Sequence, residues 1–179
     1  LMLLVFSKNF YTAAINNYFQ FYTIQKFGFS NEQAQLYLFY FLGAVAAGTL
    51  IGGFFGDKVG RKFIIWFSIL GTAPFALWLP YADAATTGVL IVLIGFIIAS
   101  AFASILVYSQ ELLPNKIGMI SGFFYGFAFG MGGLASALLG KLIDLTDIYF
   151  VYKVCSFLPL MGLIAYFLPN LKKISKSEN

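Results

Sequence analysis

The chain has 179 residues, of which 60% are hydrophobic and only 10% are charged. A soluble domain carries about 25% charged residues, so this composition excludes an ordinary water-soluble globular protein. The chain has no histidine and one cysteine, Cys155, which excludes an internal disulfide and a metal site built from Cys and His. The net charge of +4 lies in short loops and a tail, so it indicates a membrane rather than nucleic acid as the partner.

Apolar segments follow one another along the chain, each near the roughly 20 residues that a helix needs to cross a bilayer. They predict an all-α integral membrane fold with six transmembrane helices, at about 1–25, 33–55, 62–80, 86–109, 117–142 and 149–168. Residues 1–169 would form one bundle, and residues 170–179 a basic cytoplasmic tail. Because the chain begins inside an apolar run without an initiator Met, we expect it to be part of a longer protein.

The connections between these helices carry most of the charge. Ser30 has the residue type expected of an N-cap for the second helix. The second connection, the fourth connection and the tail share one side and hold Lys58, Arg61, Lys62, Lys116, Lys172, Lys173 and Lys176. The other side holds Lys26, with Lys141 and Lys153 near helix ends, and the acids Glu32, Asp83, Asp144 and Asp147. The positive-inside rule therefore predicts that both termini are cytoplasmic.

The first helix carries a polar face, which lipid cannot satisfy. Lys8, Thr12, Asn16 and Gln20 follow at intervals of four residues, and Asn9 flanks them. We expect this face to line a substrate path or another water-filled cavity. Lys8 is the most expensive member, since a charge deep in the bilayer costs roughly 2.5–3.5 kcal/mol on insertion scales. It is either a cavity cation for an anionic substrate or carboxylate, or a lysine that extends to the cytoplasmic interface.

The fourth helix carries a second polar stripe that approaches the cytoplasm. It runs from Ser100 through Ser104 and Tyr108 to Glu111. We expect Ser104 and Tyr108 to lie opposite the first helix on the substrate path. Glu111 is either a proton carrier or ion-pair partner, or a solvated residue at the helix end.

Glycines recur at intervals of four in two helices, as in close helix contacts within membranes. The second helix has Gly48 and Gly52, and the fifth has Gly122, Gly126 and Gly130. Both stripes are predicted to pack helices together, as either sliding or static contacts. A catalytic set is not visible: a Ser-His-Asp arrangement needs histidine, and the run Gly130–Gly133 lacks the flanking strand and Lys-Ser/Thr of a phosphate loop. We therefore expect no enzyme and no cofactor.

The second connection contains the run Gly53-Phe54-Phe55-Gly56-Asp57-Lys58-Val59-Gly60-Arg61-Lys62. It resembles the cytoplasmic signature loop of the major facilitator superfamily, G-x-x-x-D-[RK]-x-G-[RK]-[RK]. Asp57 can pair with Arg61 or meet a helix N-terminus, and Gly60 permits the tight turn between them. The resemblance implies a gating loop made by Gly53, Asp57, Gly60, Arg61 and Lys62.

A closer resemblance covers nearly the whole chain. The stretches AVAAGTLIGGFFGDKVGRK, LIGFIIASAFASILVYSQELLP, GMISGFFYGFAFGMGGLASALLGKLIDLT and VYKVCSFLPL are similar to the C-terminal half of bacterial fosmidomycin-resistance transporters. This implies half of a twelve-helix proton-coupled drug exporter, built from two inverted three-helix repeats. Its partners would be the bilayer, a small-molecule substrate, protons, and a missing N-terminal half or a second copy.

The sequence leaves three functions open. The first is export of a small, anionic antibiotic or metabolite by alternating access in a bacterial cytoplasmic membrane. The second is proton-coupled uptake of a small organic solute by the same fold. The third is a membrane subunit that does not transport.

Overall fold

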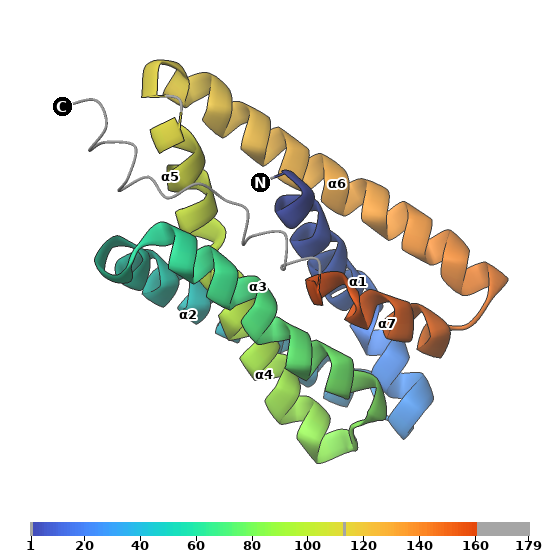
Figure 1. Cartoon of the computed structure of the whole chain (residues 1–179). Helices are drawn as coiled ribbons and strands as arrows, with labels where there is room; N and C mark the ends of the chain where they lie inside the picture. Colours follow the sequence, from blue (N-terminus) through green and yellow to red (C-terminus); the bar gives the residue numbers. More distant parts are fainter. Residues whose placement is uncertain (1, 113, 161–179) are drawn as a thin grey trace.

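The computed structural model describes residues 2–112 and 114–160. These residues form helices joined by very short connections (Figure 1). The helices are α1 (Met2–Phe27), α2 (Asn31–Val59), α3 (Arg61–Trp78), α4 (Ala84–Ser100), α5 (Phe102–Leu112), α6 (Ile117–Leu145) and α7 (Ile148–Ser156), with 3₁₀ turns η1 (Leu79–Tyr81) and η2 (Pro114–Lys116). The prediction of an all-helical membrane fold is confirmed.

Four stretches of the described chain are long and apolar enough to cross a membrane. They are Asn31–Val59, Arg61–Tyr81, Ala84–Leu112 and Pro114–Leu145. Helix α1 has 26 residues, which is also long enough, but its polar face lowers its mean hydropathy. The predicted sixth helix is described only as α7 and the residues up to Leu160, so its remaining part and the tail 170–179 lie outside the described residues.

The packing of the helices fits two interlocked three-helix units. Helix α2 makes its most extensive contacts with α4, and α6 makes its own with α1 (Figure 1). If α1–α3 is one unit and α4–α7 the other, the middle helix of each unit packs on the first helix of the other. This arrangement fits an inverted repeat, because a single pseudo-two-fold rotation would superpose the α2–α4 contact on the α6–α1 contact.

The expected connection at 56–62 is almost entirely helical. Helix α2 continues to Val59 and α3 begins at Arg61, so the turn is the single residue Gly60. Its φ of 110° lies in the region that glycine tolerates best, which confirms its predicted role in the turn. At the other end, α2 begins at Asn31 rather than 33, because Ser30 and Gln33 form a reciprocal capping box.

The predicted fourth helix is broken at Ala101 into α4 and α5. No proline or glycine marks the break. Two hydroxyl groups instead bond the carbonyls at the end of α4: Ser100 Oγ donates to Ile97 O at 2.7 Å, and Ser68 Oγ of α3 donates to Ile98 O at 3.1 Å. Such bonds satisfy carbonyls that a helix leaves open at its C-terminus. A break stabilised partly from another helix was not predictable from the local sequence.

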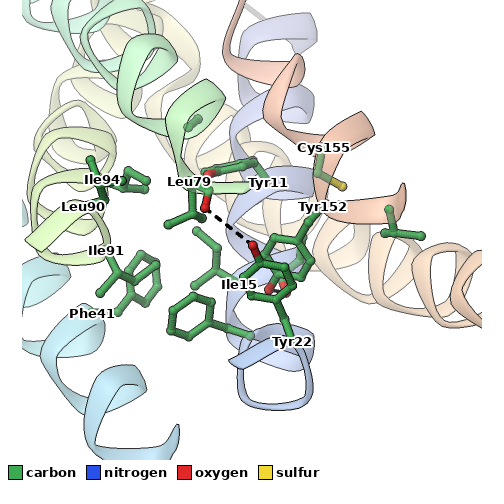
Figure 2. Packing of buried hydrophobic residues seen from close by; sticks show 14 of the residues in the cluster. Tyr11, Ile15, Tyr22, Phe41, Leu79, Leu90, Ile91, Ile94, Tyr152 and Cys155 are labelled. Carbon is green, nitrogen blue, oxygen red and sulfur yellow. Dashed lines mark hydrogen bonds between the residues drawn. The ribbon is translucent and has the colours of Figure 1, made fainter. Parts of the chain in front are cut away.

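The larger buried cluster combines aromatic and aliphatic side chains and joins α1, α4, α7 and η1, with further members from α2, α3 and α6 (Figure 2). The rings of Tyr22 and Tyr152 stack with their centroids 4.2 Å apart, and Tyr152 Oη donates to Ala14 O at 3.0 Å. A second cluster, around Ile65, Ile105 and Tyr108, lies toward the opposite end of the bundle. The two clusters hold the helices on either side of a polar region between them.

The two glycine stripes behave differently. A Cβ added at Gly48 or Gly52 would collide with the backbone of Phe96 or Ser100, so the α2 stripe packs directly on α4. Glycine lets the two helix backbones approach closely at these positions. Among the described residues nothing packs against the α6 stripe, since Gly122, Gly126 and Gly130 have open space beside them, so close packing there stays a prediction.

Candidate functional site: a polar cavity along helix α1

A cavity of about 450 Å³ opens beside the polar face of α1. Its volume lies within the range of roughly 300–1,000 Å³ typical of small-molecule sites. It is lined by α1, α2, α4, α5 and α6, through Lys8, Asn9, Thr12, Ala13, Asn16, Asn17, Val45, Thr49, Ile98, Ala99, Phe102, Ala128, Phe129, Gly132, Gly133 and Ser136. The helix break at Ala101 falls next to this lining, between Ala99 and Phe102.

Lys8 is the one charged residue of this lining, and it is 8% exposed. Its Nζ has no hydrogen-bond partner in the described part of the chain. The nearest compensation is the ring of Phe102, whose centroid lies 5.6 Å from Nζ. A desolvated ammonium without a partner is unfavourable, so this position calls for an anionic group from outside the described residues.

Mostly apolar side chains line the space next to the cavity on the side of the α1 N-terminus. A second, small cavity of about 30 Å³ continues there from Lys8 and Asn9. Its other walls are Val5, Phe102, Ile105, Leu106, Phe124, Tyr125 and Ala128. By this measure roughly 10–15 Å³ is enough for one water molecule, so this part has space for only a few waters and is much smaller than the main cavity.

The other polar residues of α1 are partly bonded within their own helix. Asn9 Nδ2 donates to Val5 O, and Thr12 Oγ1 donates to Lys8 O, both at 2.9 Å. These bonds fix the side chains while leaving the amide and hydroxyl oxygens able to accept from a solute. Asn16 is exposed along the same lining.

The structure brings some predicted path residues together and separates others. Lys8, Asn9, Thr12 and Asn16 share the cavity, whereas Gln20 lies beyond its lining. Ser104 is buried, and Gly56 of α2 packs against it so closely that a Cβ there would meet Ser104 Oγ. Tyr108 is buried in the second apolar cluster. In this structure Ser104 and Tyr108 pack against α2 and α3, away from the cavity lining, so their place on a substrate path stays a prediction.

The sequence analysis did not predict the role of two residues that line the cavity, Asn17 and Ser136. Asn17, which flanks the polar stripe of α1, donates through Nδ2 to Ser136 Oγ of α6 at 2.8 Å. Tyr18 Oη donates to the backbone O of the same Ser136 at 2.6 Å. Ser136 carried no local signal, because its role depends on a partner 119 residues away.

The signature loop forms a three-residue ionic cluster at the end of the bundle. Arg61 Nη2 bonds Asp57 Oδ1 at 3.0 Å, and Arg61 Nη1 bonds Glu111 Oε1. Arg61 begins α3, Asp57 lies in the last turn of α2, and Glu111 lies near the end of α5. Of the alternatives for Glu111, the structure shows an ion-pair partner.

Each charge of this cluster lies at the unfavourable end of its own helix. A helix dipole disfavours carboxylates near the C-terminus, where Asp57 and Glu111 lie, and cations near the N-terminus, where Arg61 lies. The ion pairs offset these terms, and the side chains of Asp57 and Glu111 are 71% and 45% exposed. Exposed pairs are worth only about 0–1 kcal/mol, so these ion pairs add little to the free energy that holds the helix ends together.

The other end of the bundle is fixed by Lys26. Its Nζ donates to Tyr22 Oη at 3.0 Å, Pro80 O at 2.9 Å and Ala82 O at 2.8 Å, which uses all three ammonium protons. In the connection between η1 and α4, the side-chain hydrogen bond of Thr86 lowers the pKa of the Asp83 carboxyl. Asp83 stays ionised at the N-terminus of α4, where the helix dipole favours negative charge.

Long apolar helices around an open polar cavity define the class: a multi-pass membrane protein with a solute-sized cavity. Residues 1–178 match the Major Facilitator Superfamily, and the chain belongs to this family.

Three relatives place it more closely. It is 64% identical to the fosmidomycin resistance protein of Escherichia coli over 170 residues, which are 95% of this chain and 42% of that protein. It is 40% identical to the uncharacterised MFS-type transporter YfnC of Bacillus subtilis, over 90% of this chain and 39% of the relative. It is 28% identical to the cis,cis-muconate transport protein of Acinetobacter baylyi, over 69% of this chain and 30% of the relative. The chain therefore spans less than half the length of these relatives.

Proposed function

We propose that this chain is the C-terminal half of a proton-coupled drug exporter of the fosmidomycin-resistance type, which works by alternating access. The observation that carries the proposal is Lys8, a buried cation without a hydrogen-bond partner on a cavity of about 450 Å³. The family and the 64% identity to the fosmidomycin resistance protein support it. The chain acts as a carrier and not as an enzyme, in a bacterial inner membrane with both termini cytoplasmic.

The cavity is half of a substrate site, and the other six-helix half completes it. Substrate sites in this type of fold lie near the bilayer midplane between two repeats. The faces that meet the other half are those of α2 and α6, the least buried of the long apolar stretches. The open glycine stripe of α6 supports this assignment, since glycines let another backbone approach closely.

The cycle follows from the two ends of the bundle. The mostly apolar walls of the small cavity beside Lys8 support a constriction on the route toward the cytoplasmic end, where the weak ion pairs of Asp57, Arg61 and Glu111 join α2, α3 and α5. Breaking this cluster allows the cytoplasmic ends to separate and the constriction to open. The strongly bonded Lys26 keeps the opposite ends of α1 and α3 fixed.

The test is export by the full-length transporter that contains this half. Lys8→Gln removes the charge and retains a polar side chain, so export of an anionic drug should fall at least about tenfold, as expected for a lost charge-assisted bond. Lys8→Arg should keep part of the activity. Unchanged resistance with Lys8→Gln at normal expression would refute the proposal.

A second candidate is proton-coupled uptake of an organic acid. The name of the Acinetobacter relative specifies transport of a carboxylate, and Lys8 suits such a group as well. Vesicles with an imposed pH gradient separate the two: an exporter moves solute against the proton, and an uptake symporter moves both together.

A further inference from the structure

Lys8 borders two different environments. It lines the cavity of about 450 Å³, whose walls include several amide and hydroxyl groups. It also lines the small cavity of about 30 Å³, whose other walls are mostly apolar. Its Nζ is itself buried and has no hydrogen-bond partner among the described residues. The nitrogen therefore lies against side chains and not at the surface of the larger cavity, although the residue lines that cavity.

No carboxylate lies in the walls around Lys8. Apart from Lys8, the one titratable side chain among the described residues that line either cavity is the phenol of Tyr125 on α6. The lining residues of α2, α4 and α5 include none. The acidic residues that the structure describes all lie at helix ends or in connections, namely Glu32, Asp57, Asp83, Glu111, Asp144 and Asp147.

A buried amine without a partner is more stable uncharged than charged. Moving an ammonium out of water without a counter-charge is so costly that such a group gives up its proton instead. The contact of Nζ with the Phe102 ring, at 5.6 Å from the centroid, offsets only a small part of that cost. Because this half alone buries Nζ, a carboxylate of the other half does not reach it without displacing the side chains that cover it.

We propose that Lys8 is an uncharged amine while the cavity is empty, and that it takes up one proton together with the anionic group of the solute. The proton comes from the solution in the open cavity and forms one N–H bond on Nζ, and the resulting ammonium–anion pair is neutral overall. The flexible four-carbon stem lets the charged nitrogen move from the apolar side into the larger cavity.

This inference rests on the anion site of the proposed function and holds for export and for uptake. It also fixes the direction in which one proton moves. The proton on Lys8 crosses the membrane with the anion, in the same direction. A proton that drives export by moving the opposite way therefore binds a different group.

Nitrogen NMR of the empty transporter measures the charge of Lys8 directly. The full-length transporter that contains this half is labelled with nitrogen-15 at lysine Nζ and studied near neutral pH in buffer without chloride. One nitrogen should have the chemical shift of a neutral amine, and this signal should be missing in Lys8→Gln. Lys26 is the internal reference for a charged lysine, because its Nζ donates to three oxygens. Ammonium shifts for every lysine, Lys8 included, would overturn the inference.

Calorimetry on the same protein measures the proton that accompanies the anion. Hexane-1-sulfonate is the probe, since a sulfonate stays ionised and any proton taken up goes to the protein. Titrations in two buffers of different ionisation enthalpy should show uptake of about one proton per bound anion. Because binding consumes a proton, affinity should rise about tenfold for each unit by which the pH is lowered, as long as the empty site is uncharged.

Substitutions at Lys8 separate the proton from the anion. Lys8→Arg supplies a cation that does not lose its proton in proteins, so it should bind the sulfonate without proton uptake and with little dependence on pH. Lys8→Gln should bind at least about tenfold more weakly and also take up no proton. Lys153→Met is the matched control, since Lys153 lies over the ring of Tyr81, away from both cavities. It should keep the affinity and the proton uptake of the wild type.

The remaining outcomes distinguish this inference from the proposed function. Proton uptake that persists in Lys8→Arg would assign the proton to another group and overturn the inference. Sulfonate binding that depends on Lys8 but takes up no proton would also overturn it, and would leave the anion site standing. Sulfonate binding that is absent, or unaffected by Lys8→Gln, would overturn the anion site and with it the inference.

Discussion

The guanidinium of Arg61, at the first residue of α3, bonds the carboxylate of Glu111 near the end of α5. The two residues are far apart in sequence, and the bond crosses from one three-helix unit to the other. With Asp57 on the second guanidinium nitrogen, Arg61 links three helix ends through contacts that are half exposed. Ion pairs this exposed contribute only about 0–1 kcal/mol each, so they can break at little cost.

Removing this link should change transport more than stability. Arg61→Gln and Glu111→Gln should each shift the free energy of unfolding by no more than about 1 kcal/mol, because exposed ion pairs contribute little. Transport rates should fall in both variants, and the double variant should resemble Arg61→Gln, because that variant already removes the Arg61–Glu111 contact together with the pair to Asp57. Thermal unfolding and vesicle transport measure the two effects.

Lys58→Gln is the control for charge alone, since Lys58 lies in the same loop over the ring of Phe54. It should leave transport near the wild-type rate. Additive losses in the double variant would contradict a shared Arg61–Glu111 contact.

The α2–α4 contact should not tolerate a single added methyl group. A Cβ at Gly52 would collide with the backbone of Ser100, which cannot rotate away. Gly52→Ala should therefore destabilise the protein by about 1–3 kcal/mol, as overpacking does. Gly53→Ala is the neighbouring control, because its Cβ would lie at 3.8 Å from Ala103 Cβ, an ordinary contact. Equal melting temperatures of the two variants would refute the direct backbone contact.

The glycine face of α6 should be sensitive to side-chain size in the full-length protein. If the other half covers it, Gly126→Ala and Gly126→Leu should lower the melting temperature in order of increasing volume. If it faced lipid, both variants should match or exceed the wild type, because alanine and leucine are better helix formers than glycine by up to about 1 kcal/mol. Thermal unfolding in detergent distinguishes the two results.

Lys26 should contribute to stability rather than to transport. Lys26→Met retains the apolar stem but leaves Pro80 O and Ala82 O without their donor. Each lost partner of a shielded polar group costs about 1–3 kcal/mol, so unfolding should occur at a clearly lower temperature. Lys153→Met is the matched control, since its Nζ lies over the ring of Tyr81 at 5.8 Å. An unchanged melting temperature for Lys26→Met would show that water replaces its bonds.

Much of this protein was determined by the sequence alone. Hydropathy and segment length determine where the long helices lie in the sequence. The spacing of Lys8, Thr12 and Asn16 places these side chains on one polar face of α1. Ser30 and Gly60 set helix ends through side-chain and backbone terms that act within a few residues. These features were predictable because the bilayer and the local chain impose them without reference to other helices.

Only the tertiary structure decided which surfaces meet. The two glycine stripes have the same spacing, but the α2 stripe packs on α4, whereas Gly126 of α6 has open space beside it among the described residues. Ser104 and Tyr108 are buried, and the break at Ala101 is supported by Ser68 from another helix. The pairing of Asn17 with Ser136 joins residues 119 positions apart. Helical periodicity places a side chain on a face, but the partner of that face depends on non-local packing, which no local pattern contains.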